Sequence, residues 1–312
     1  MLKYVLKRLG YILVTLWVIV TCTFFMMKNL PGTPFDAERF SIMTPQQQER
    51  VLEMYGLNDS LPMQYVKYIK NMLKGDLGTS FTYVNQDVSK VITGRLGPSA
   101  LIGIQAVLIG LAIGLILGIL AAWKHNSGID YFTMILAVLG VSVPNFVAAA
   151  LLQYYIGLKW GALPVGFWTG WNCSVLPSIA LSFSATAMVA RFMRTEMLDV
   201  LDQDYIVTAR AKGLSQMKVL MRHAVRNSIL PVVTILGPIV VNLMTGSLAV
   251  ENIFSIPGIG SLFVDCIKAN DYPVIMGITI FYAAFYMLIV LLVDMAYSLI
   301  DPRIRLAKGK ES

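Results

Sequence analysis

Six long stretches of this chain contain no charged side chain, and they constrain its fold more than any other feature. Each can supply the roughly 20 apolar residues that a helix needs to cross about 30 Å of hydrocarbon. A helix also satisfies its backbone hydrogen bonds within a single segment, which the bilayer interior requires. We therefore expect an all-α integral membrane protein with six transmembrane helices. The stretches are residues 9–27, 96–123, 131–158, 160–190, 227–250 and 272–293.

Composition supports a membrane protein and argues against a soluble one. Hydrophobic residues make up 56% of the chain and charged residues only 14%, which is too few to cover a soluble surface. The net charge of +7 could indicate nucleic-acid binding, but the basic residues gather at the ends of the uncharged stretches. That distribution is typical of membrane topology. We therefore expect contact with lipid and none with nucleic acid.

The same basic residues predict the orientation. Lys and Arg precede the first stretch and follow the last, so both termini are expected in the cytoplasm, with an even number of spans. Residues 191–226 carry seven basic side chains, whereas 159–173 and 251–271 carry one each. We assign 191–226 to the cytoplasm and expect the fourth span to start near Ser174. The first stretch could be a signal peptide, but no small-residue cleavage site closes it, so a retained span is favoured.

A polar region of residues 28–95 follows the first span and should fold at least partly outside the membrane. Residues 45–55 predict a short helix with Thr44 as its N-cap. Residues 61–73 predict an amphipathic helix near the interface, and Gly75 to Ser80 predict a turn. The region is either a solvated cap or a docking surface. The expected division is 1–27 for the N-terminus and first helix, 28–95 extracytoplasmic, 96–302 for a five-helix core, and 303–312 for a cytoplasmic tail.

Small residues and prolines mark the predicted spans. Glycines recur at four-residue spacing in the second span, on one helix face, so a neighbouring helix can approach closely. Prolines in the third and fifth spans free backbone carbonyl groups and favour kinks. These residues are Gly110, Gly114 and Gly118, followed by Pro144, Pro231 and Pro238.

Motifs for catalysis are absent from the sequence. There is no phosphate-binding loop ending in Gly-Lys-Ser/Thr, no His-Glu-x-x-His and no Gly-x-Ser-x-Gly. We therefore expect no enzymatic activity, no cofactor and no metal in this chain, and read the two histidines as surface residues. Cys173 and Cys266 both fall on the predicted outer side and could form a disulfide. Asp294 either pairs with a nearby basic residue or, less favoured, serves proton coupling.

One cytoplasmic segment resembles the ATPase-binding loop of ABC-importer permeases. The family pattern is Glu-Ala-Ala, three residues, Gly and a later Leu-Pro. This chain reads Val-Thr-Ala-Arg-Ala-Lys-Gly over 207–213, followed by Leu230 and Pro231. Val207 and Thr208 replace the first two residues and the spacing to Pro231 is longer, as in the peptide and nickel branch. The resemblance implies that these residues couple the chain to an ATPase: Tyr205, Thr208, Ala209, Arg210, Ala211, Lys212 and Gly213.

Further motifs in the same order resemble the "B" type permease of oligopeptide and dipeptide systems. They are Asn29-Leu30-Pro31-Gly32, Tyr55-Gly56-Leu57, the segments 75–80 and 250–260, and Asp301-Pro302-Arg303-Ile304-Arg305. The resemblance covers essentially the whole chain. It implies a type I ABC-importer permease fold in the bacterial plasma membrane.

The resemblance also implies the partners. A second related permease, two ATPase subunits that bind ATP and Mg, and an extracytoplasmic peptide-binding protein would complete the transporter. The peptide would pass between the two permeases. When ATP draws the ATPases together, the loop that each permease seats in them would move and tilt the spans.

Two further sets of residues are assigned to transport. Polar residues within apolar stretches are costly unless they face water or a partner, and these predict the pathway: Gln105, Ser142, Asn145, Gln153, Asn242 and Thr245. Residues 251–271 are too apolar for an ordinary loop and too broken for a span, and predict an outer gate that dips into the membrane. Its candidate residues are Phe254, Pro257, Gly258 and Gly260.

Other functions stay open from the sequence. An ion-driven secondary carrier would need no ATPase, and a membrane-embedded hydrolase would show turnover by the chain alone. Within the resembled family, importers of nickel chelates, glutathione or sugars share these permease motifs. We favour ATP-driven import of peptides.

Overall fold

The computed structural model describes residues 2–300 except 30–39, 41, 85 and 245–247. These residues form two compact units: one lies within 2–97 and 258–285, and the other within 98–257 and 286–300. The described residues are mostly helical, with one isolated β-bridge between Thr79 and Asp87. The prediction of an all-α protein is thus confirmed. The proposed motif at 301–305, the tail 303–312 and Thr245 lie outside the described residues.

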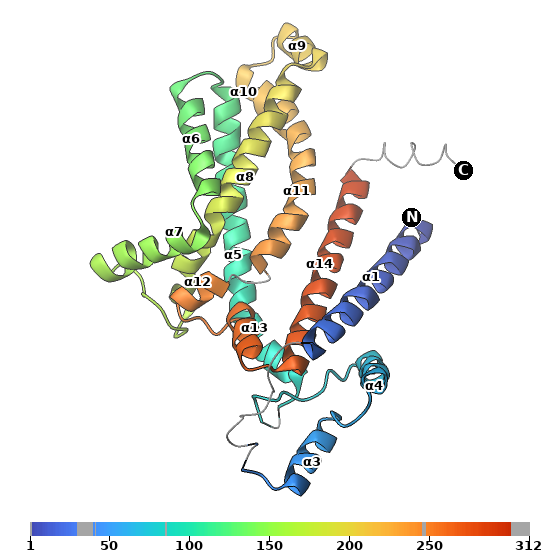
Figure 1. Ribbon diagram of the computed structural model, residues 1–312. Helices are drawn as coiled ribbons and strands as arrows, with labels where there is room; N and C mark the ends of the chain where they lie inside the picture. The colour runs from blue at the N-terminus through green and yellow to red at the C-terminus, as the bar shows by residue number, and fades with distance from the viewer. Residues whose placement is uncertain (1, 30–39, 41, 85, 245–247, 301–312) are drawn as a thin grey trace. The chain divides into compact units, whose positions relative to one another are not determined.

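Most of the uncharged stretches coincide with a long helix. Figure 1 shows the helices with their labels. The long ones are α1 (Leu2–Lys28), α5 (Val88–Trp123), α8 (Val175–Leu201), α11 (Arg226–Met244) and α14 (Tyr272–Ile300). The shorter ones are α3 (Pro45–Met54), α4 (Leu61–Leu73), α6 (Gly128–Ser142), α7 (Asn145–Leu152), α9 (Asp204–Ala211), α10 (Gln216–Val219), α12 (Leu248–Ile253) and α13 (Ile259–Lys268). Among the described residues, five helical segments are long and apolar enough to cross a membrane, or six if one bent pair is a single span.

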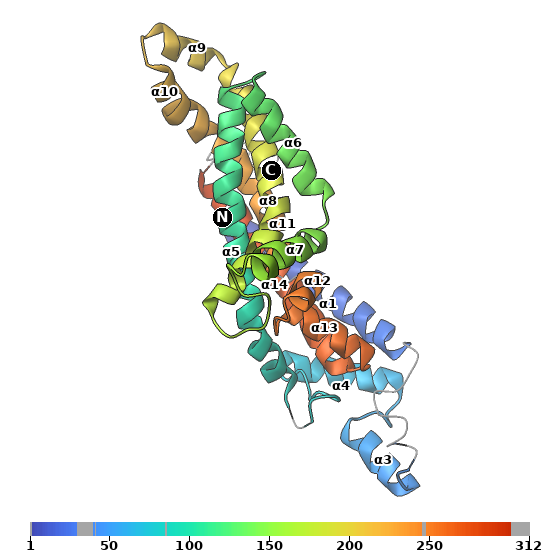
Figure 2. The same ribbon diagram turned by 90° about the vertical axis from the view of Figure 1, so that its left-hand side faces the viewer.

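That bent pair corrects the third predicted span. Residues 131–158 were expected to form one crossing helix, but α6 ends at Ser142 and the chain bends by 101° before α7 continues. Val143 is extended, with φ −81° and ψ 119°, because the ring of Pro144 disfavours helical backbone at the residue before it. A π-helical turn, Gln153–Lys159, then extends α7. The kink expected at Pro144 is a break, as the side view shows (Figure 2).

Within the unit of residues 98–257, α5 packs against α8 through the three predicted glycines. A Cβ atom placed on Gly110 or Gly114 would lie 2.7 Å from the Cβ of Ala185 or Val189, and one on Gly118 would lie 2.6 Å from the Ala190 carbonyl oxygen. Only a residue without a side chain permits such an approach. The packing role predicted for these glycines is confirmed. The same contact contributes to a buried core that includes Ile102, Leu181 and Met193.

The start of α8 also agrees with the sequence. A short 3₁₀ turn over Trp171–Ser174 leads directly into Val175, so the fourth span begins where it was expected. On the same unit, α5, α6, α8 and α11 run alongside one another, and α9 and α10 lie at one end of this bundle (Figures 1 and 2). The bundle therefore presents the predicted cytoplasmic loop at a single end.

The other unit contains the polar region and the start of α14. Thr44 caps α3 as predicted: its hydroxyl accepts from the Gln47 amide at 3.4 Å, while the Gln47 side chain accepts from the Thr44 amide at 2.9 Å. The predicted helix over 61–73 is α4. The predicted turn uses Gly75 and Gly78, whose φ angles of 82° and 86° favour glycine.

A buried carboxylate fixes the segment after this turn. Asp271 and Ser80 are both fully buried, and the Ser80 hydroxyl donates to Asp271 Oδ2. The amides of Phe81 and Thr82 donate to the same carboxylate at 3.2 and 3.0 Å. Since Asp271 directly precedes α14, it joins the polar region to the beginning of that helix.

Candidate functional site

The proposed coupling segment forms a short, capped helix. The extended residue Gln203 precedes α9, and Lys212 ends it. Gly213 then adopts φ +78°, and its amide donates to the Arg210 carbonyl at 2.9 Å. A glycine in this left-handed conformation is a common helix terminator, so Gly213 ends α9.

One side of α9 packs inside the protein. Ile206 is fully buried and Ala209 is 6% exposed, and both pack with Val219 of α10. Because Ala209 is small, α9 can pack closely against α10 of the same chain. Ala209 therefore does not contribute to the exposed face. The family resemblance had placed Ala209 among the residues that couple the chain to an ATPase.

The opposite side of α9 is exposed. The residues on this side include an aromatic ring, a β-branched side chain, two cations and several small residues. Such a surface could fit an acidic groove on another protein. The residues are Tyr205, Val207, Thr208, Arg210, Ala211, Lys212 and Gly213. Six of the seven predicted coupling residues thus share one accessible surface. The Thr208 hydroxyl donates to the Asp204 carbonyl at 3.0 Å, which keeps this side chain against the helix.

One hydrogen bond links α9 to α11, and a second links α11 to α8. Asn227 in the first turn of α11 donates through its side-chain amide to the Tyr205 hydroxyl at 3.0 Å. Ser228 donates to the Glu196 carbonyl of α8 at 3.1 Å. Only two residues separate α8 from α9. The exposed helix is therefore held by both α8 and α11.

A charged cluster that the sequence did not predict lies on the same unit. Asp130, in the first turn of α6, is 2% exposed and accepts two hydrogen bonds from Arg194 of α8, at 2.6 Å from Nε and 2.8 Å from Nη2. His125 Nδ1 lies 3.1 Å from Asp130 Oδ2 and 3.2 Å from Arg194 Nη2. His125 is exposed, as expected for a surface residue, although its ring also contacts this cluster. The sequence signal for this cluster is Asp130 itself, an acidic residue directly before the third uncharged stretch.

The predicted pathway residues are dispersed. Gln105 accepts from the Ser178 hydroxyl at 2.8 Å, which pairs α5 with α8. The Gln153 side-chain amide donates to the carbonyls of Val165 and Ile253, at 2.5 and 2.7 Å. Ser142 and Asn242 are exposed, and Asn145 is half-buried. Gln105 and Gln153 thus have structural hydrogen bonds of their own, and the pathway assignment stays a prediction.

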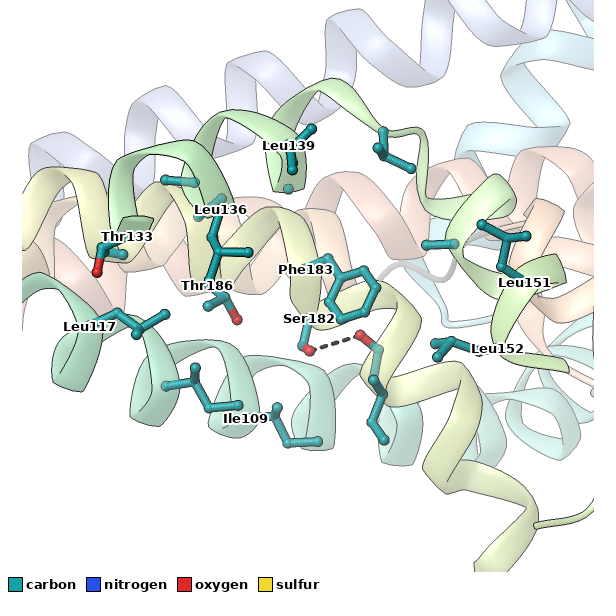
Figure 3. Close-up of a pocket in the computed structure, with 18 of the residues that line it drawn as sticks. Ile109, Leu117, Thr133, Leu136, Leu139, Leu151, Leu152, Ser182, Phe183 and Thr186 are labelled. Carbon is teal, nitrogen blue, oxygen red and sulfur yellow. Dashed lines mark hydrogen bonds between the residues drawn. The ribbon is translucent and has the colours of Figure 1, made fainter. Parts of the chain in front are cut away.

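A cavity in the same unit is apolar and is lined by none of these residues. It encloses about 910 Å³ between α5, α6, α7 and α8. Figure 3 shows aliphatic side chains such as Ile109 and Leu136 around it, with hydroxyl groups only from Thr133, Ser182 and Thr186 among the labelled residues. The Ser182 hydroxyl already donates to the Ile179 carbonyl at 2.8 Å. Such a lining offers little to a polar solute.

The predicted gate residues occupy several environments. Phe254 is buried in the core around α8, and its carbonyl accepts from the Phe167 amide at 2.8 Å. Pro257 follows it in the same unit. Gly258 precedes α13 in the other unit, and Gly260 is buried in the first turn of that helix. Two short helices, α12 and α13, replace a span here, as the broken sequence predicted.

The gate segment begins with a buried acidic residue that the sequence did not predict. Glu251 is fully buried in α12, and its Oε1 accepts from the Ser99 hydroxyl of α5 at 2.7 Å. Within the described residues there is no group of His, Cys, Asp and Glu side chains that could hold a metal ion.

Cys173 and Cys266 are free thiols, so the disulfide that the sequence left open is not formed. The side chain of Asp294 lies outside the described residues.

Known sequences resemble this chain over its full length. It is 46% identical over 306 residues to the dipeptide transport system permease protein DppB of Lactococcus lactis subsp. cremoris, covering 98% of this chain and 100% of that protein. It is 39% identical over 309 residues to the oligopeptide transport system permease protein OppB of Salmonella typhimurium, again covering 98% and 100%.

Solved structures share the fold. An amino acid ABC transporter crystallised with histidines matches with a TM-score of 0.51 and 19% identity, covering 69% of this chain and 94% of that one. The MetNI methionine ABC transporter, in inward-facing conformations, matches with a TM-score of 0.54 and 14% identity, covering 68% and 97%. At these identities the likeness shows the fold alone, and it is the expected type I ABC-importer permease fold.

Family comparisons agree with both results. Residues 1–96 match the N-terminal family of binding-protein-dependent transport system membrane components. Residues 114–306 match the family described as the binding-protein-dependent transport system inner membrane component. This chain belongs to that family of multi-pass membrane permeases.

Proposed function

We propose that this chain is the B-type permease subunit of an ATP-driven importer of peptides. The observation that carries the proposal is the full-length similarity to permeases of dipeptide and oligopeptide transport systems, at 46% and 39% identity. The sequence lacks a phosphate-binding loop, so the energy for transport would come from ATP and Mg bound by partner ATPase subunits.

The exposed face of α9 is the proposed ATPase contact. Arg210 and Lys212 present two positive charges at the end of the helix, where acidic side chains of a partner would meet them. The buried contacts of Ile206 and Ala209 hold this face in place. A displacement of α9 would therefore reach α8 and α11 as a rigid-body movement.

The complete assembly would contain a second related permease, two ATPase subunits and an extracytoplasmic peptide-binding protein. Both termini and the loop that carries α9 would lie in the cytoplasm, since the basic residues concentrate there. The pathway would then run between the two permeases.

Reconstitution of the co-expressed subunits into proteoliposomes tests this function. We expect uptake of a labelled dipeptide only when ATP, Mg and the binding protein are all supplied. A matched preparation energised by a proton or sodium gradient should show none. Uptake by this chain alone under an ion gradient would contradict the proposal and favour a secondary carrier.

A further inference from the structure

A second cavity, of about 350 Å³, lies within the unit that holds the polar region. Its walls come from the end of α1, the end of α3, one side of α4, the turn after α4 and the start of α14. A volume of this size suits a small ligand. Unlike the apolar cavity of Figure 3, it is lined by charged and aromatic side chains, among them Lys28, Glu53, Tyr68, Asp76 and Tyr272.

Lys28 contributes a cation without a carboxylate partner among the described residues. Its side chain is half-buried, and Nζ lies 5.7 Å from the ring centre of Phe24 and 6.0 Å from that of Tyr272. These aromatic faces stabilise the ammonium group only partly. By contrast, Lys67 in the same cavity already forms an ion pair with Asp59 at 2.6 Å. Lys28 is therefore the cation available to an incoming anion.

Tyr68 contributes a buried donor without a partner. Its hydroxyl is shielded from solvent and has no hydrogen-bond partner within the described part of the chain. Burial raises the pKa of this phenol, which keeps it neutral and able to donate. Leaving such a group unsatisfied is costly, so a ligand oxygen at this position would be stabilised. The neighbouring Tyr65 hydroxyl differs, because it lies 2.7 Å from Thr21 Oγ1.

The position of the cavity relative to the membrane indicates the source of its ligand. The apolar part of α1, Lys7–Lys28, has 22 residues and would extend about 33 Å, close to the hydrocarbon thickness, so Lys28 lies at one membrane surface. On α4, Leu61, Met63, Val66 and Leu73 are all exposed. Apolar side chains on a short amphipathic helix are typical of a helix that lies in the membrane interface.

We infer that this cavity binds the headgroup of a zwitterionic phospholipid, with the phosphate at Lys28 and Tyr68. The two exposed carboxylates that line the same cavity, Glu53 and Asp76, would face the headgroup's ammonium group. Asp76 Oδ1 already accepts from the Gly78 amide at 2.8 Å, which fixes the orientation of that side chain. A phosphatidylethanolamine headgroup has both charges, whereas phosphatidylglycerol lacks the cation.

Native mass spectrometry of the co-purified transporter can measure this binding. The full-length chain, stripped of lipid by detergent, would be titrated with short-chain phosphatidylethanolamine, with the matching phosphatidylglycerol and with water-soluble glycerophosphoethanolamine. We expect the wild type to bind phosphatidylethanolamine most tightly. Tight binding of phosphatidylglycerol to the same degree would overturn the zwitterionic headgroup. Equal binding of glycerophosphoethanolamine would overturn the membrane lipid as the source.

Substitutions locate the site. Lys28→Met keeps the aliphatic stem over Phe24 and should weaken phosphatidylethanolamine binding about tenfold to a hundredfold, since a charge-assisted hydrogen bond is lost. Tyr68→Phe removes only the unpartnered hydroxyl and should weaken it about threefold to tenfold. Lys70→Met and Tyr65→Phe, on the same α4 helix, are the matched controls and should bind as the wild type does.

Unchanged affinity in Lys28→Met would overturn the inference. If that variant does not fold, Tyr68→Phe decides, because it removes no protein hydrogen bond and should leave the fold intact. Equal loss in Tyr68→Phe and Tyr65→Phe would also overturn it, as the effect would then belong to α4 as a whole. None of these outcomes depends on which solute the transporter carries.

Discussion

Arg194 of α8 and Asp130 of α6 form a two-point ion pair, with N···O distances of 2.6 and 2.8 Å. The pair joins the first turn of α6 to the last third of α8, two turns before the segment that leads to α9. Two parallel hydrogen bonds fix the relative rotation of the helices as well as their separation. The pair therefore stiffens the end of the bundle that displays α9.

Arg194→Ala should destabilise the protein strongly. It would leave the Asp130 carboxylate, which is 2% exposed, without its main counter-charge. Breaking a buried ion pair from one side costs about 3–5 kcal/mol, and His125 can offset part of this by donating to Asp130. Thermal unfolding followed by intrinsic fluorescence would measure the loss. Arg191→Ala, at an exposed position of the same helix, is the control and should unfold near the wild-type temperature.

Glycine-to-alanine changes on α5 should have opposite effects at two positions. At Gly114 a Cβ atom would lie 2.7 Å from Val189 Cβ and 2.8 Å from the Thr186 carbonyl oxygen, so α8 would have to move away. At Gly94 nothing lies within 4 Å of the added atom, and alanine should stabilise the helix by about 0.5–1 kcal/mol. Unfolding temperatures in detergent compare the two variants directly. Equal temperatures would contradict the close packing of α5 on α8.

Charge reversal on α9 should separate ATPase binding from folding. Replacing Arg210 and Lys212 with glutamate should strongly reduce co-purification of the ATPase subunits, because both side chains are exposed and would then repel acidic groups. Lys218→Glu, an exposed charge change on α10, is the matched control. The yield of folded permease should be the same in all variants. Normal ATPase recovery by the double variant would contradict the proposed contact.

Cys266 should react slowly with thiol reagents in the folded protein. Burial, followed by the nearby carboxylates of Asp271 and Asp265, raises the pKa of this thiol to about 12. A rise from 9.0 to about 12 lowers the thiolate fraction at pH 8 roughly a thousandfold. Because only the thiolate reacts, labelling should accelerate as the pH rises toward 12.

Maleimide labelling would measure this rate in a chain that keeps Cys266 while Cys22 and Cys173 are replaced by alanine. Unfolding the same variant in denaturant removes the burial and should restore ordinary reactivity at pH 8. A folded chain that labels as fast as the unfolded one would contradict the buried environment of Cys266.

Local sequence patterns predicted much of the fold. Thr44 is the N-cap that the sequence predicted, and the helix predicted over 61–73 is α4. Each of these features depends on residues within one or two turns of the helix. The uncharged stretches located most of the long helices for the same reason. Each membrane-spanning helix must supply its own run of apolar residues, so it can be recognised from its own segment of sequence.

Contacts between distant residues could not be predicted in this way. Asp271 and Ser80 are 191 positions apart, and Arg194 and Asp130 are 64 apart. No periodicity or spacing relates such pairs, and only the folded backbone brings them together. The sequence also could not predict which way Ala209 faces. A small residue in the coupling motif suits a partner's groove and a close internal contact equally well. Its burial against Val219 distinguishes the two.

The Tyr205–Asn227 hydrogen bond has a mechanical consequence. A helix attached at one end can swing freely, but α9 is attached to α8 by a two-residue connection and to α11 by this bond. The bond therefore links α9 to α11 in addition to its chain connection to α8. In the proposed function, a push by the ATPase on the exposed face of α9 would therefore be passed to two long helices and not to one.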